Sequence, residues 1–243
     1  MNMAVNLEIK KEADGFRKRH GLGSKDSINI KGLLLKLKVL TVYKPIHPNI
    51  SGMAIKTDGH RFILINSNDT LGRQNFSVLH ELYHLYVQES FEYSICSENG
   101  KTREEKNADN FASLLLLPEN GILDFVPADE LKKKNVSLGT VLEIEHYYMC
   151  SRSALLNRLK GLKLLGAEQF QKYSENIISN ARHYGYETDL YRPGNANLVI
   201  GDYGKRAKLL FDKDIISESH FISLMKDINI DIDENPAESK DPD

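Results

Sequence analysis

The stretch NFSVLHELYHLYV, residues 75–87, places two histidines and one glutamate within five positions of an otherwise apolar segment. Apolar residues recur with helical spacing after Gly72, which predicts a helix. On such a helix, His80 and His84 share one face about 6 Å apart along the axis, so both imidazoles can reach one tetrahedral metal ion. Glu81 lies about 100° around from His80, where it can act as a general base toward water at the metal.

A second interpretation treats both histidines as core residues with ordinary hydrogen-bond partners. The neighbours Val78, Leu79 and Leu85 are apolar, so the polar residues would be half-buried and would need partners in either case. The five-residue pattern therefore favours a metal site without deciding it.

The next predicted helix offers a third ligand. In REEKNADNFA, residues 103–112, Glu105 and Asp109 lie four positions apart on the face that also carries two alanines. Glu105 can complete a His-His-Glu set, and Asp109 can accept the outer N–H of a liganding histidine. The alternative is a solvated acidic stripe that pairs with Lys101 or Lys106.

Three segments together resemble the ImmA/IrrE family of zinc metallo-endopeptidases. They are ISGMAIKTDGHRFILINS (50–67), GRQNFSVLHELYHL (72–85) and EEKNADNFASLLLLPE (104–119). The likeness extends from about residue 10 to about residue 165. It implies that His80, His84 and Glu105 bind zinc, for which manganese can substitute, and that Glu81 is the catalytic base. The family pattern selects Glu105 over Glu104.

The predicted fold class is α+β. A zincin-like metallopeptidase core, with a small mixed sheet and the HExxH helix, is expected at 1–125. A helix-turn-helix-like helical segment follows at 126–166, then a small C-terminal module at 167–228 and a disordered acidic tail at 229–243. The hairpin strand RFILIN (61–66) is a candidate edge for pairing with extended substrate, and an internal position is the alternative.

Composition limits the broad class. A hydrophobic share of 41%, a charged share of 27% and a net charge of −2 are typical of a globular protein without a global field toward nucleic acid. The only cysteines, Cys96 and Cys150, show no ligand spacing, which indicates a reducing compartment. The sequence shows neither the apolar run of a signal peptide nor one long enough to span a bilayer. We expect a cytoplasmic protein with no membrane association.

The leading functional hypothesis is a site-specific zinc endopeptidase. The resemblance implies a protein substrate, typically a helix-turn-helix repressor of a mobile element, prophage or stress response. Arg73, Tyr83 and Tyr86 are candidates for stabilising the transition state. Two alternatives stay open: a non-catalytic metal-containing binding module, such as a toxin–antitoxin component or regulator partner, and a DNA-binding regulator. The net charge of +5 over 131–165 invites the DNA-binding alternative, and the absence of an N-terminal basic arm argues against direct nucleic-acid binding.

Overall fold

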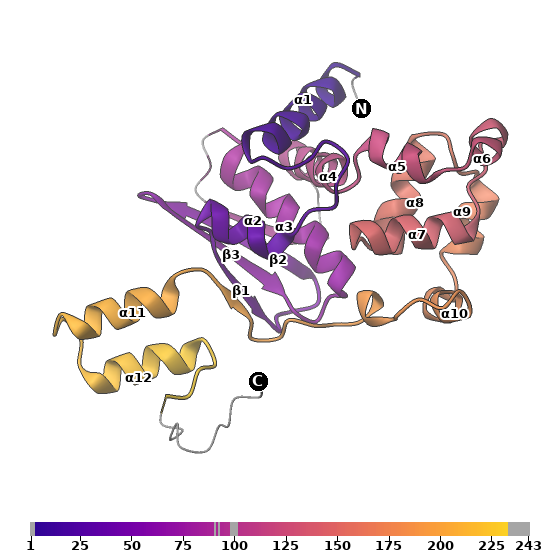
Figure 1. Cartoon of the computed structure of the whole chain (residues 1–243). Helices are drawn as coiled ribbons and strands as arrows, with labels where there is room; N and C mark the ends of the chain where they lie inside the picture. Colours follow the sequence, from indigo (N-terminus) through magenta and orange to yellow (C-terminus); the bar gives the residue numbers. More distant parts are fainter. Residues whose placement is uncertain (1–2, 90, 92, 98–101, 233–243) are drawn as a thin grey trace.

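The computed structural model describes residues 3–89, 91, 93–97 and 102–232 (Figure 1). Most of the predicted acidic tail therefore lies outside the described residues. The strands are β1 (Leu40–Lys44), β2 (Ile50–Thr57), β3 (His60–Asn66), β4 (Tyr93–Ser97) and β5 (Val199–Ile200). The helices are α1 (Met3–Arg19), α2 (Ile30–Leu37), α3 (Leu71–Tyr86), α4 (Arg103–Leu116), α5 (Glu119–Phe125), α6 (Ala128–Lys133), α7 (Leu138–Tyr148), α8 (Arg152–Gly161), α9 (Ala167–Tyr173), α10 (Ile177–His183), the 3-10 helix η1 (Asp189–Tyr191), α11 (Tyr203–Asp212) and α12 (Glu218–Asp227).

The strands form one mixed sheet in the order β4-β2-β3-β1-β5. β1 runs parallel to β3, and the other neighbours are antiparallel. The prediction that RFILIN (61–66) forms an edge was wrong, because β3 is hydrogen-bonded to β1 on one side and to β2 on the other. Ile63 and Ile65 of β3 are fully buried, as expected of an internal strand.

α3 covers one face of the sheet, where it contacts β2 and β3 (Figure 1). α4 packs on α3, and α1 packs on α4, so the helices form successive layers over the sheet. Aromatic side chains join these layers: the ring of Phe16 in α1 meets that of Phe111 in α4 edge-on, with centroids 5.7 Å apart. This packing holds the HExxH helix rigidly between the sheet and α4.

Pro118 begins a helix as well as following one. The segment 103–119 is expected to contain a helix that ends before Pro118, and α4 ends at Leu116. Pro118 is then the N-cap residue of α5, since a residue without a backbone N–H loses nothing at the start of a helix. The short helices α5 and α6 were not predicted.

α7 and α8 lie within the segment 126–166 that was expected to be helix-turn-helix-like, and a short turn at Cys150 separates them. Met149 ends α7 in the left-handed region with φ 51°, and the Ser151 side chain caps α8. The turn sits directly on α3, because a Cβ at Gly72 would lie 2.7 Å from the backbone of Cys150. Asn75 of α3 adds a hydrogen bond to the Met149 carbonyl at 2.9 Å.

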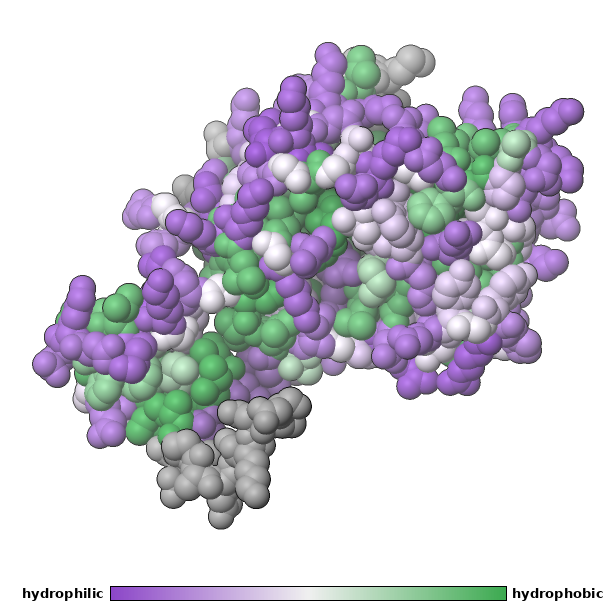
Figure 2. All heavy atoms as spheres, in the orientation of Figure 1, coloured by the Kyte–Doolittle hydropathy of each residue, from purple (hydrophilic) through white to green (hydrophobic). Residues whose placement is uncertain are grey.

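The chain after η1 returns to the sheet. Buried Gln74 donates to the Gly194 carbonyl at 2.9 Å, and β5 pairs with β1. Residues 167–228 thus add a strand to the sheet of residues 1–125, and the boundaries at 125, 166 and 228 stay predictions. α11 and α12 form a hairpin beyond β5 (Figure 1), and Figure 2 shows hydrophobic and hydrophilic residues mixed on its visible face.

Candidate metal centre

Two imidazoles from α3 point to one place. His80 and His84 are each 1% exposed, and their Nε2 atoms lie 3.2 Å apart. The one-turn spacing predicted from the sequence therefore brings both nitrogens together.

α4 supplies a carboxylate at the same point. Glu105 Oε2 lies 3.2 Å from His80 Nε2, and Oε1 lies 3.4 Å from His84 Nε2. The pKa of Glu105 is held well below its usual range, first by hydrogen bonds from His80 and His84. The Thr102 side chain caps α4 through the Glu105 N–H, which fixes the first turn that carries this ligand candidate.

The three donor atoms fit a tetrahedral divalent metal. The two Nε2 atoms lie 3.2 Å apart, and each is 3.2–3.4 Å from one oxygen of the Glu105 carboxylate, Oε2 for His80 and Oε1 for His84. A tetrahedral zinc with bonds of about 2.0–2.1 Å keeps its ligand atoms about 3.3–3.4 Å apart. Two imidazole nitrogens and one carboxylate oxygen are also the donor types that zinc takes at catalytic sites. His80, His84 and Glu105 can therefore hold a metal without moving apart.

The outer ring nitrogens of both histidines have acceptors. His80 Nδ1 lies 3.0 Å from Asp109 Oδ1, and His84 Nδ1 lies 2.5 Å from Gln88 Oε1. With the proton on Nδ1, each Nε2 keeps its lone pair for a metal. Asp109 stands where the sequence predicts. Gln88 was missed because it lies beyond the end of α3, in the turn that follows Tyr86, where the periodicity of the helix does not predict its position.

Glu81 is fully buried beside the sheet. Its Oε1 approaches β2 so closely that a Cβ on Gly52 would lie 2.8 Å away. The β2–β4 ladder shifts register between Ile50 and Gly52, which marks an irregularity at this point of the sheet. The absence of a side chain at Gly52 therefore makes room for the carboxylate of Glu81.

The profile of the peptidase M78 family, the IrrE N-terminal-like domain, matches residues 35–160. This chain belongs to that family. The ImmA/IrrE resemblance is confirmed, and membership in the M78 family implies metallopeptidase activity on a protein. No curated protein matches the chain in sequence.

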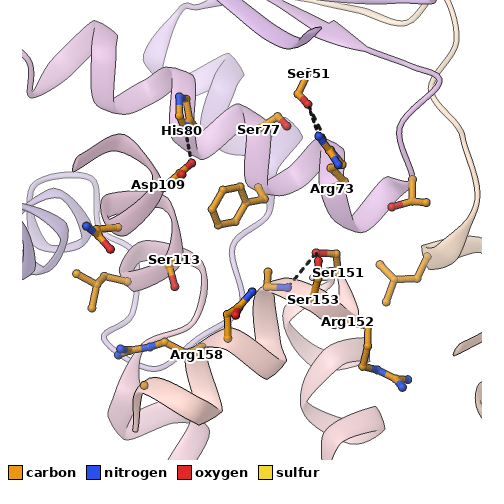
Figure 3. A pocket seen from close by; sticks show the side chains of 18 of the residues that line it. Ser51, Arg73, Ser77, His80, Asp109, Ser113, Ser151, Arg152, Ser153 and Arg158 are labelled. Atoms are coloured by element: carbon orange, nitrogen blue, oxygen red, sulfur yellow. Dashed lines mark hydrogen bonds and ion pairs between the residues drawn. The ribbon is translucent and has the colours of Figure 1, made fainter. Parts of the chain in front are cut away.

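His80 of the candidate metal centre lines a cleft of about 1280 Å³ (Figure 3). His80 and Asp109 lie at one end of its lining, and side chains of α8 and η1, such as Ser153 and Tyr191, form other parts. Arg158 of α8 lines it as well. The cleft thus lies between the metal-binding candidates and the helix-turn-helix-like pair.

The three candidate transition-state stabilisers occupy different places. Arg73 lines the cleft and donates to Ser51 Oγ at 2.8 Å. Tyr83 donates to Glu104 at 2.8 Å, and burial raises the pKa of its hydroxyl. Tyr86 points into the core and donates to the Leu37 carbonyl at 3.2 Å. Of these three side chains, the structure brings only Arg73 to the cleft lining.

A buried ion pair supports the cleft wall formed by α8. Arg152 Nη2 lies 2.8 Å from Glu145 Oε2, and both side chains are at most 1% exposed. The Tyr191 hydroxyl donates to the same carboxylate at 3.0 Å. The pair therefore joins α7, α8 and η1.

Within the described ranges, no helix combines the length and the hydropathy needed to cross a bilayer.

Proposed function

We propose that this chain is a zinc-dependent, site-specific endopeptidase that hydrolyses a peptide bond in a regulatory protein. The supporting observation is the donor set of His80, His84 and Glu105 with the carboxylate of Glu81 on the same helix as the histidines. The described residues supply three ligand side chains, which leaves a fourth position for water, as in catalytic zinc sites. Manganese is the expected substitute metal.

Each side chain of the site has its own role in the proposed reaction. Bound zinc supplies Lewis acidity, which activates water and polarises a carbonyl. Glu81 takes the proton of the attacking water and passes it to the leaving nitrogen. Asp109 and Gln88 hold the two imidazoles in the Nδ1–H tautomer. Arg73 is the candidate that can stabilise negative charge on substrate bound in the cleft.

The proposed substrate class is a helix-turn-helix repressor of a mobile element, prophage or stress response. Family resemblance supports this class. A cleft with walls from α3, α4 and α8 can receive a segment of another protein.

Two features of α8 speak against the DNA-binding alternative. A recognition helix reads base edges with its N-terminal residues. Here Ser151, Ser153 and Asn157 line the cleft, and the preceding turn packs on α3 at Gly72. The face that would enter a major groove is therefore turned toward the metal centre.

If the gene beside this chain's gene encodes a helix-turn-helix repressor, that repressor is the test substrate. Wild type loaded with zinc should cleave it, whereas Glu81→Gln should keep stoichiometric zinc and leave the repressor intact. His84→Ala should lose the metal. Purified wild type without bound metal after gentle preparation would contradict the proposal. Tight repressor binding by wild type and Glu81→Gln, with cleavage by neither, would support a non-catalytic binding module instead.

A further inference from the structure

Arg158 is a cation of the cleft that pairs with no acid among the described residues. Its Nε donates to the Leu117 carbonyl at 3.0 Å, at the C-terminal end of α4. In the part of the chain that the structure describes, no carboxylate lies within 4.0 Å of its guanidinium. The two terminal nitrogens of the half-buried side chain are thus available to a molecule in the cleft.

The other cations of the cleft lining are paired. Each lies within salt-bridge distance of an acid: Lys10 with Glu119 at 3.3 Å, Arg73 with Asp69 at 3.3 Å, and Arg152 with Glu145 at 2.8 Å. Burial lowers the pKa of Arg158, and more distant Glu119 and Asp14 oppose this effect. A partly desolvated guanidinium with no nearby carboxylate favours an anionic ligand. Its planar pair of N–H donors matches the geometry of a carboxylate.

The distance between Arg158 and the candidate metal centre can be estimated along α4. Asp109, Ser113 and Leu114 of this helix all line the cleft, and Figure 3 shows Ser113 between Asp109 and Arg158. Asp109 hydrogen-bonds His80 at the metal centre, and Leu117 accepts from Arg158. The eight residue-to-residue steps from Asp109 to Leu117 span about 12 Å. An extended peptide covers this distance with three or four residues, at about 3.3 Å each.

We propose that Arg158 binds a side-chain carboxylate of the substrate, from an aspartate or glutamate three or four residues from the scissile bond. This specificity rests on the proposed endopeptidase function. The substrate class is then an extended protein segment that carries an acidic residue at a fixed distance from the cleavage site. Arg158 is a specificity-determining residue here, because it contacts substrate away from the reacting atoms.

The experiment is a cleavage profile on a proteome-derived peptide library, read by mass spectrometry, with zinc-loaded wild type and Glu81→Gln as the blank. Cleavage sites far from peptide ends should be enriched in Asp or Glu at the third or fourth position on one side. For a peptide with that acid, Arg158→Gln should lower kcat/KM about ten- to hundredfold. Exchanging the acid for its amide should cause the same loss in wild type and little further loss in Arg158→Gln.

Two variants serve as controls. Arg158→Lys keeps the positive charge and should retain a preference for an acid. Lys160→Gln removes one positive charge from the same helix, outside the cleft lining, where Lys160 lies over the Phe170 ring at 5.3 Å. Lys160→Gln should therefore cleave with the wild-type preference.

The outcomes separate this inference from the proposed function. Cleavage without an acidic preference at either distance, or an unchanged preference in folded Arg158→Gln, overturns the role of Arg158 alone. If Arg158→Gln does not fold, the wild-type profile still decides. Wild type that cuts no peptide and no repressor overturns the endopeptidase proposal, and the inference with it.

Discussion

Gly52→Ala tests whether the room beside Glu81 matters for catalysis. The added Cβ would lie 2.8 Å from Glu81 Oε1, and 3.3 Å from both Glu81 Cγ and Ile65 Cδ1. Relaxing the short contact to an ordinary one moves the carboxylate by about half an ångström or more. The shortest contact is the one to Glu81 Oε1, so the Glu81 side chain has to shift within its own fully buried surroundings.

We expect kcat/KM to fall about ten- to hundredfold, because displacing a general base by up to 1 Å lowers the rate by about this factor. This fall corresponds to about 1.4–2.7 kcal/mol of transition-state stabilisation. Zinc affinity should stay at the wild-type value, since the three nearest atoms to the added carbon belong to Glu81 and Ile65. The free energy of unfolding should fall by about 1–3 kcal/mol from overpacking.

The assays are repressor cleavage, zinc affinity by chelator competition and urea unfolding. In a Glu81→Gln background, Gly52→Ala should cause no further loss of rate, because it acts through the same carboxylate. A Gly52→Ala enzyme that cleaves at the wild-type rate, or one that loses zinc, would refute the assignment of Gly52 as a positioning residue for Glu81.

Three further predictions concern other parts of the structure. Gln88→Leu removes the acceptor of His84 Nδ1–H and should weaken zinc binding about 10–100-fold, measured by chelator competition; an unchanged affinity would show that Gln88 does not orient the ligand. Arg152→Met leaves Glu145 buried without its cation and should lower the free energy of unfolding by about 3–5 kcal/mol in urea, with part of the loss recovered by adding Glu145→Gln. Burial, aided by the charge of Arg152, lowers the pKa of His146, so the folded state favours its neutral form. This contribution to stability is complete above the unfolded pKa of about 6.5 and is lost as pH falls toward the lower folded pKa; His146→Gln should therefore show a smaller stability loss than wild type between about pH 7.5 and 5.5.

Local patterns in the sequence indicated most of the residues of the candidate metal centre. The spacing of His80 and His84 predicted a shared helix face, and the second helix predicted a carboxylate at Glu105 with Asp109 one turn later. The structure brings these four side chains together. Residues four apart on a helix are neighbours whatever the rest of the fold does, and the roles of these four residues stay predictions. Gln88 lies in the turn after α3, so helix periodicity did not predict its contact with His84.

Contacts between distant segments were beyond local patterns. β3 carries a short apolar run with two isoleucines, which left both an edge and an internal position open, and only its pairing with β1 decided the question. Tyr86 lies in the HExxH helix, yet its hydroxyl reaches Leu37 in the core.

The sequence by itself determined the helix that carries two ligand candidates and a candidate base, the third ligand candidate, and the family. The tertiary structure decided which backbone meets Glu81, at Gly52, and which cation faces the cleft, at Arg158. The physical reason is range: helix periodicity acts over a few residues, whereas sheet order and interhelical packing join segments separated by tens of residues.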